Sequence, residues 1–237
     1  VLHAAGVPRA ALQLLPGDGA SVGARLVGDA RTLGVMFTGS TEVARLLQAA
    51  LAERLDAQGR PIPLIAETGG QNVMIVDSSA LVEQVVGDVV SSAFDSAGQR
   101  CSALRVLCVQ DDVADRVIAM LKGAMAECRI GHPETLEVDI GPVIDAEARD
   151  GIEQHVEALR AKGRRVHRDA RGPEADRTHG TFVLPTLIEL DSLGELGREV
   201  FGPVLHLVRF RRDGLDRLLE EINQTGYGLT MGVHTRI

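Results

Sequence analysis

The sequence predicts an α/β fold built on parallel β-sheets. Short apolar runs of the length of buried strands alternate with longer segments in which apolar residues recur at helical spacing. Glycine and proline residues separate most of these runs. Strands that alternate with helices are typical of a parallel sheet with right-handed crossovers. With 237 residues, of which 45% are hydrophobic, the chain can form one large domain or two smaller ones.

The composition argues against several classes of protein. A formal net charge of -8 disfavours binding to a nucleic-acid backbone. No apolar run is long enough to cross a bilayer, and the N-terminus lacks a signal-peptide pattern. Three cysteines without C-x-x-C spacing disfavour a disulfide framework or a zinc site, so we expect a reducing, cytoplasmic environment. The histidines are scattered, and we expect no metal site.

The first part of the chain is predicted to contain strand, helix, strand, helix and strand. The predicted elements are a strand over Ala11–Leu15, a helix over 19–29, a strand over Leu33–Phe37, a helix from Thr41 to about Ala57 and a strand over Pro63–Glu67. The second helix is clearly amphipathic. Its predicted inward face consists of Val43, Leu46, Leu47, Ala50, Leu51 and Leu55.

After Gly69 and Gly70 the pattern restarts, so we predict one domain over 1–69 and a second over 70–237. Predicted strands cover 72–77, Ala103–Val109, a short stretch near Val166, 181–190, 204–210 and the end of the chain. Predicted helices cover Ala80–Ala93, a segment capped by Asp111 and ending near Glu127, Asp145–Ala161 and Leu215–Ile222. The polar segment 168–180 is predicted to be an exposed loop.

The stretch FTGSTEVA, residues 37–44, is the first that could carry chemistry. A strand ends, Gly39 follows, and a helix begins at Ser40 or Thr41. Glycine permits close approach of a ligand to the backbone, and a helix N-terminus favours a phosphate. The stretch lacks the G-x-G-x-x-G pattern and the P-loop lysine, so an ordinary strand–helix turn remains an open interpretation.

The stretch LIAETGGQN, residues 64–72, places Glu67 at the carboxyl end of an apolar strand. In open parallel sheets ligands bind at that edge. A partly desolvated carboxylate there has a raised affinity for protons and can serve as a general base. A solvated loop glutamate is the alternative.

Cys101 differs from the other two cysteines. Cys108 lies inside an apolar strand and Cys128 near a helix end, so both are expected to be structural. Cys101 has small or polar neighbours and follows Arg100, and a nearby cation favours the thiolate. Taken alone, a nucleophile and a packed thiol are both open. Together with the glycine turn and Glu67, the thiol fits a dehydrogenase that forms a covalent intermediate. In such an enzyme a thiohemiacetal transfers a hydride to a nicotinamide, and a carboxylate then activates water.

Four motifs in the same order, FTGSTEVA, ETGGQN, GQRC and EVFGPV, resemble those of the aldehyde dehydrogenase superfamily. Longer stretches such as LLPGDG, SAGQRCSALRVLCVQ, GPVIDAEA and EVFGPVLHLVRF are similar to the aldehyde dehydrogenase module of the proline utilization A family. The resemblance covers essentially the whole chain. It implies part of a Rossmann-like NAD domain over 1–69, followed by an incomplete α/β catalytic domain.

In that family the module oxidises L-glutamate γ-semialdehyde, the open form of Δ1-pyrroline-5-carboxylate, to glutamate with NAD. An FAD-dependent proline dehydrogenase module precedes it, and we expect the parent protein to be a homo-oligomer. The resemblance makes Cys101 the nucleophile and Glu67 the general base. It implies cofactor binding by Gly17, Gly39, Ser40, Glu199 and Phe201, and substrate binding by Ser102.

The family's oxyanion asparagine and ribose-binding lysine would precede residue 1, and its substrate-gripping loop would follow residue 237. We therefore expect this segment alone to be inactive or nearly so, and prone to association. Three alternatives stay open. One is an acylating dehydrogenase, against which Glu67 counts. Another is a non-catalytic scaffold, and the third is a thiol hydrolase, which needs a histidine partner.

Overall fold

The computed structural model describes residues 1–171 and 179–237, and these form two compact units, Val1–Thr68 and Gly69–Ile237. Both units combine helices with parallel strands, so the chain has the expected α/β fold. Within the described residues, no helix is both long and apolar enough to span a membrane.

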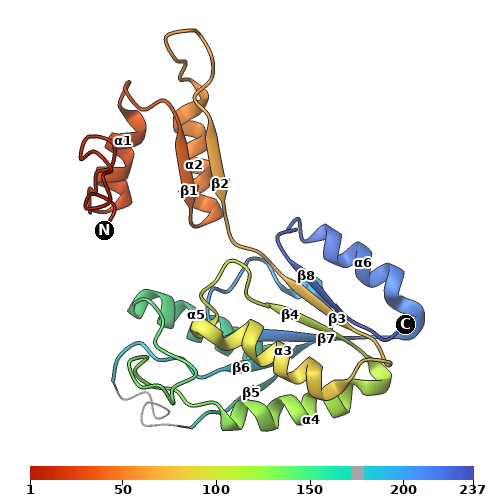
Figure 1. The fold of residues 1–237 in the computed structure, drawn as a ribbon. Helices are drawn as coiled ribbons and strands as arrows, with labels where there is room; N and C mark the ends of the chain where they lie inside the picture. Colours follow the sequence, from red (N-terminus) through yellow and green to blue (C-terminus); the bar gives the residue numbers. More distant parts are fainter. Residues whose placement is uncertain (172–178) are drawn as a thin grey trace. The chain divides into compact units, whose positions relative to one another are not determined.

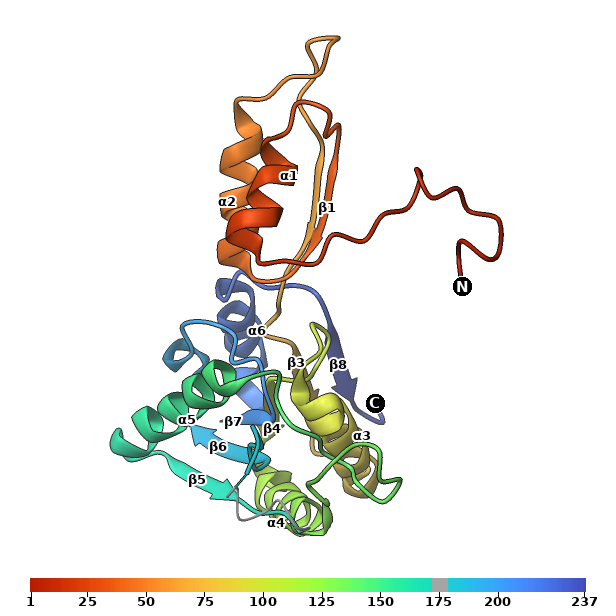
Figure 2. The ribbon, with the colours of Figure 1, turned by 90° about the vertical axis from the view of Figure 1, so that its left-hand side faces the viewer.

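The first unit is a two-stranded parallel sheet with helices on one face (Figure 2). Strand β1 (Val35–Thr38) pairs with β2 (Leu64–Glu67), and Thr38 lies opposite Glu67 at their carboxyl ends. A π-helical turn, η1 (Gly19–Gly23), leads into α1 (Ala24–Gly28), and α2 (Thr41–Ala52) follows β1. The small core contains Val27, Leu51 and Ile62.

Two expectations for the first unit are wrong. Residues 11–15 form no strand, and Leu14 and Leu15 are exposed, since a strand needs a neighbour and β1 and β2 pair only with each other among the described residues. Helix α2 ends at Ala52 rather than near Ala57. Leu55 instead forms an antiparallel bridge with Pro61, and the Asp56 carboxylate accepts backbone hydrogen bonds that close the turn between them.

The predicted inward face of α2 is mostly exposed. Leu51 is buried and Leu47 packs against the core, whereas Val43, Leu46 and Leu55 are exposed. Two strands offer too narrow an apolar surface to cover the whole stripe of this helix.

In the second unit, the described residues form a six-stranded sheet in the order β5-β6-β7-β4-β3-β8 (Figure 1). All neighbouring pairs are parallel except β5 and β6. The strands are β3 (Val73–Val76), β4 (Val106–Gln110), β5 (Arg165–Arg168), β6 (Thr186–Leu190), β7 (Val204–Phe210) and β8 (Met231–His234). The helices are α3 (Val82–Phe94), α4 (Asp111–Glu127), α5 (Ala146–Ala161) and α6 (Leu215–Gln224).

Helices cover both faces of this sheet. Figures 1 and 2 show α3 and α4 on one face and α5 and α6 on the other. Every residue of β4 is therefore buried, which explains the apolar run before its last residue, Gln110. Burial raises the pKa of Cys108, within β4, to about 12. It raises the pKa of Cys128, directly after α4, to about 11.

Several predicted boundaries in this unit differ from the observed ones, for example at Asp111 and before β6. Asp111 is the first residue of α4, and Gln110 precedes it as the N-cap without a side-chain cap. The expected strand over 181–190 is confined to its second half, β6, after Pro185. Of the predicted loop over 168–180, residues 172–178 lie outside the described residues.

Candidate active site

Cys101 lies in a tight loop, residues 95–103, that joins α3 to β4 and that we call the cysteine loop. Its first turn, Asp95–Gly98, contains two non-glycine residues in the left-handed region, Ser96 at φ 56° and Ala97 at φ 53°. Such backbone is strained and persists only where the surroundings hold it. The loop must therefore be fixed by contacts with other segments.

Gln99 and Gly98 supply two of these contacts. The Gln99 side chain donates to the carbonyl of Pro142 at 3.3 Å and accepts from the backbone N–H of Ile144 at 2.8 Å. Gly98, at φ 64°, approaches the chain so closely that an added Cβ would lie 2.2 Å from the carbonyl oxygen of Gly202. The cysteine loop is thus held against the segment that follows α4 and against the segment that precedes β7.

Asn72 fixes the loop at the cysteine itself. Its Nδ2 donates to the carbonyl oxygens of Cys101 at 2.7 Å and Ala103 at 2.8 Å. Its Oδ1 accepts from the backbone N–H of Thr230 at 3.1 Å. Asn72 is only 3% exposed, and its hydrogen bond to Ala103 is buried, whereas those to Cys101 and Thr230 are partly buried. The backbone of Cys101 is therefore rigidly placed while its side chain remains free.

The three cysteines, all in the described part of the chain, differ in access to solvent. Cys101 is exposed, whereas Cys108 and Cys128 are buried. The raised pKa of each buried thiol disfavours its reactive thiolate form. Of the three, only Cys101 is open to a substrate.

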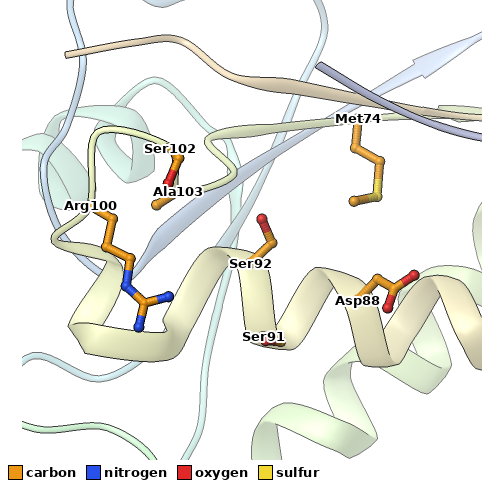
Figure 3. A pocket seen from close by; sticks show the side chains of 7 residues that line it. All are labelled: Met74, Asp88, Ser91, Ser92, Arg100, Ser102 and Ala103. Atoms are coloured by element: carbon orange, nitrogen blue, oxygen red, sulfur yellow. The ribbon is translucent and has the colours of Figure 1, made fainter. Parts of the chain in front are cut away.

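A hollow of about 440 Å³ lies beside the cysteine loop. Arg100 and Ser102, on either side of Cys101, contribute to its wall (Figure 3). The other lining residues are Met74, Asp88, Ser91, Ser92 and Ala103. Arg100 is exposed, and its Nε donates to the Ser96 hydroxyl at 3.0 Å, so its charge lies at the edge of the hollow.

Glu199 and Phe201 meet a buried arginine, Arg105, at the start of β4. Nε and Nη2 of Arg105 both donate to Oε1 of Glu199, at 3.1 and 3.0 Å. The guanidinium also lies 5.2 Å from the ring centroid of Phe201. Burial lowers the pKa of Arg105, whereas the charges of Glu199 and Cys101 raise it. The structure thus places the predicted Glu199 and Phe201 around one cation.

In the first unit, three predicted residues lie at the carboxyl edge of the two-stranded sheet. The backbone N–H of Gly39 donates to the carbonyl of Glu67 at 3.1 Å. The Ser40 hydroxyl caps α2 by accepting from the N–H of Val43 at 3.2 Å. Gly17 lies apart from these strands, on the segment before η1, where an added Cβ would be 2.3 Å from Val22.

Two residues that hold the site were missed in the sequence interpretation, Asn72 and Arg105. Arg105 carries a detectable signal, because a charged residue inside an apolar strand-like run must find a partner on folding. Asn72 has a weaker signal, as a polar residue directly before a buried strand. Arg100 is the cation nearest Cys101 in sequence and is exposed, whereas Arg105 is buried.

Comparisons with known proteins identify the family of the chain. The family model described as "Aldehyde dehydrogenase family" matches residues 1–237. The bifunctional protein PutA of Klebsiella aerogenes is 66% identical over 240 residues, which cover 100% of this chain and 18% of that protein. The 1-pyrroline-5-carboxylate dehydrogenase of Anoxybacillus flavithermus is 34% identical and matches 98% of this chain and 44% of its own length.

A crystal structure of bifunctional proline utilization A superposes with a TM-score of 0.92 at 52% identity, covering 100% of this chain and 23% of that one. The chain thus spans less than half the length of these relatives. The family model and the superposition both extend over the whole chain. The chain belongs to the aldehyde dehydrogenase family of oxidoreductases.

Proposed function

We propose that the protein containing this chain oxidises L-glutamate γ-semialdehyde to L-glutamate with NAD, and that Cys101 is the nucleophile. The observation that carries the proposal is the contrast between an exposed Cys101, whose carbonyl is fixed by buried Asn72, and two buried cysteines. A nucleophile needs this combination of a free side chain and a fixed backbone.

The reaction begins when the Cys101 thiolate attacks the aldehyde carbon and forms a C–S bond. Bound NAD supplies the acceptor for the hydride that leaves this carbon with its electron pair. The product on Cys101 is a thioester. Glu67 then takes a proton from water, the water oxygen attacks the thioester carbon, and the C–S bond breaks to release the acid and the thiolate. The proposed active residues are therefore Cys101 and Glu67.

The residues proposed to bind NAD have suitable donors and acceptors. Gly39 and Ser40 precede α2, whose first turn presents backbone N–H groups that suit a pyrophosphate. Glu199 offers Oε2, the oxygen not used by Arg105, for a hydroxyl of the nicotinamide ribose. Phe201 is 45% exposed, so its ring has a free face for the nicotinamide, and Gly17 is assigned to the adenosine pocket.

The proposed substrate follows from the relatives and from the hollow lined by Arg100 and Ser102, the two neighbours of Cys101 in the chain. One relative is named bifunctional protein PutA, and another is named 1-pyrroline-5-carboxylate dehydrogenase. Ser102 lines the hollow and is proposed to bind the α-carboxylate of the semialdehyde, while Arg100 adds a positive charge at its edge. By the same comparison, the complete protein is proposed to carry an FAD-dependent proline dehydrogenase module and to form a homo-oligomer.

The test is an assay of the complete protein that its gene encodes. Semialdehyde and NAD should yield reduced nicotinamide and glutamate in equal amounts, and both Cys101→Ser and Glu67→Gln should lower turnover by at least about 100-fold. The matched controls are Cys108→Ser and Glu157→Gln, the latter an exposed carboxylate on α5. Wild-type turnover by Cys101→Ser would refute the proposal.

An acylating dehydrogenase is the second candidate, because the thioester on Cys101 could be transferred to coenzyme A instead of water. Product analysis separates the two. Free glutamate without added thiol supports hydrolysis through Glu67. An absolute requirement for coenzyme A, with an acyl thioester as product, would favour the acylating reaction.

A further inference from the structure

We propose that Arg105 is a positioning residue that orients the Glu199 carboxylate for the cofactor and at the same time holds the cysteine loop. The inference rests on the proposed function, in which Glu199 binds the nicotinamide ribose. It assigns this role to a buried residue directly before β4, which binds one carboxylate oxygen of Glu199 and leaves the other directed toward the ligand.

Arg105 donates hydrogen bonds to one of the two carboxylate oxygens of Glu199. Nε and Nη2 donate to the same atom, Oε1, at 3.1 and 3.0 Å. Oε2 is directed toward Gly69, where an added Cβ would lie 1.5 Å from it. A carboxylate held by one oxygen in this way cannot rotate freely, so the direction in which Oε2 offers its lone pairs is fixed. Gly69 provides the space that this orientation needs.

Arg105 also contacts the segments on both sides of the site. Nη1 donates to the carbonyl of Gly202 at 3.1 Å, and the guanidinium faces the Phe201 ring. Nη2 donates to the carbonyl of Arg100 at 3.1 Å, directly before Cys101. One side chain therefore joins the segment that carries Glu199 to the loop that carries the nucleophile.

The backbone of Arg105 is itself anchored in the sheet. Its N–H donates to the carbonyl of Asn72 at 3.0 Å. Its carbonyl accepts from the backbone N–H of His206 at 2.9 Å and lies 3.1 Å from Nδ1 of the same residue. Because the backbone of Arg105 is held on both sides, its side chain loses little entropy when it holds a ligand-binding group.

A purely structural ion pair is the competing explanation. The side chains of Arg105 and Glu199 are 1% and 13% exposed, so breaking the pair leaves a buried charge and lowers stability. A structural role predicts loss of folded protein, with the surviving molecules binding NAD normally. A positioning role predicts weaker NAD binding in molecules that are fully folded.

The experiment compares Arg105→Lys with a matched control, Arg168→Lys, in the complete protein. Lysine keeps the charge but lacks the planar fork. Arg168 forms a two-bond pair with Glu153, at 2.7 and 2.8 Å, from β5 at the far edge of the sheet, and its side chain is 10% exposed. The readouts are the dissociation constant for NAD by titration calorimetry, the KM for semialdehyde, the unfolding temperature and the alkylation rate of Cys101.

The proposal predicts that Arg105→Lys raises the dissociation constant for NAD by about 10-fold or more. This is the effect expected when a charge-assisted hydrogen bond can no longer form with its proper geometry. The KM for semialdehyde should change by less than about 2-fold, and Arg168→Lys should bind NAD like the wild type. In a Glu199→Gln background, Arg105→Lys should add less than about 2-fold, because both changes remove the same interaction.

Should Arg105→Lys fail to fold, Gly69→Ala displaces Glu199 without altering the arginine, and it should weaken NAD binding to a similar extent. Its control is Gly87→Ala on α3, where an added Cβ meets nothing within 4 Å. Wild-type affinity for NAD in folded Arg105→Lys, or in Gly69→Ala, would overturn the inference alone. A wild-type protein that neither binds NAD nor oxidises the aldehyde would overturn the proposed function and this inference with it.

Discussion

Asn72 donates a hydrogen bond from Nδ2 to the carbonyl oxygen of Cys101 at 2.7 Å, from a position that is 3% exposed. The same amide bonds to Ala103 and Thr230, so one buried side chain satisfies three backbone groups from two distant parts of the chain. The thiol of Cys101 is thus exposed, while its backbone is held by a buried side chain.

Asn72→Ala should lower the free energy of unfolding by about 2–4 kcal/mol, because it leaves buried backbone groups without partners. Turnover should fall by about 10- to 100-fold in the protein that remains folded, since the cysteine loop loses its fixed position. Thermal unfolding and steady-state kinetics measure the two effects. Asn223→Ala, at an exposed position on α6, is the control and should change neither. Wild-type turnover in Asn72→Ala would show that the hydrogen bonds of Asn72 are dispensable for the reaction.

Gly98→Ala tests the close approach between the cysteine loop and Gly202. Both Gly98, at φ 64°, and Gly163, at φ 81°, are in the left-handed region, but an added Cβ at Gly163 meets nothing within 4 Å. Gly163→Ala should therefore lower the free energy of unfolding only by the backbone strain, about 1 kcal/mol. In Gly98→Ala the added Cβ would lie 2.2 Å from a carbonyl oxygen. This variant should therefore lose clearly more free energy of unfolding and most of its activity. Equal losses of unfolding temperature in the two variants would contradict this account.

Alkylation should distinguish the three thiols. With pKa values raised to about 12 and about 11, Cys108 and Cys128 are thiolates in fewer than about one molecule in a thousand at pH 8, and both are buried. Iodoacetamide should therefore label Cys101 first, and peptide mass spectrometry should find little label elsewhere until the protein unfolds. Cys101→Ser should remove the rapid phase. Labelling of Cys108 as fast as Cys101 in folded protein would be incompatible with the structure.

A pair of histidines, buried His206 and half-buried His155, makes the stability of the fold depend on pH. Nε2 of His206 lies 2.8 Å from Nε2 of His155, and burial lowers the pKa of His206 to about 3, while that of His155 is lowered by burial and by the nearby charges of Arg198 and Lys162. Because the unfolded chain binds protons more readily than the folded chain, their contribution to stability is full above pH about 6.5. It is lost as the pH falls from there toward 3.

The unfolding temperature should therefore fall more steeply between pH 7 and pH 5 in the wild type than in His206→Gln, which cannot titrate there. The expected slope of the free energy of unfolding from the buried imidazole of His206 is at most about 1.4 kcal/mol per pH unit. His179→Gln, at an exposed position, should keep the wild-type slope. Parallel profiles for the wild type and His206→Gln would show that this pair does not govern the acid response.

Local patterns predicted much of the fold, because they report burial directly. The apolar runs of β3, β4 and β7 are buried strands, and Ser40 caps α2 where the glycine turn ends. The same reasoning failed at 11–15, since an apolar run becomes a strand only when a neighbour pairs with it. It also extended α2 too far, because the Asp56 turn is stabilised by hydrogen bonds that periodicity does not reveal.

The candidate site shows a similar division. Short stretches of sequence indicate the turn at Gly39 and the strand that ends at Glu67. They leave open whether Cys101 is packed or accessible, and the structure shows it exposed. The left-handed Ser96 and Ala97 do not follow from local sequence, because their strain is offset by contacts with residues far along the chain. The partner of Arg105 is Glu199, and such a pairing is fixed by tertiary packing rather than by local pattern.

The most direct test of the central claim is the mass of the enzyme during turnover. In Glu67→Gln, the water-activating carboxylate is absent, so mixing with semialdehyde and NAD and quenching in acid should trap the acyl thioester. Peptide mass spectrometry should find the glutamyl adduct on the peptide that contains Cys101, in nearly every molecule, and only a trace of it in the wild type. Formation of reduced nicotinamide without an adduct on Cys101, or with the adduct on Cys108 or Cys128, would contradict the account.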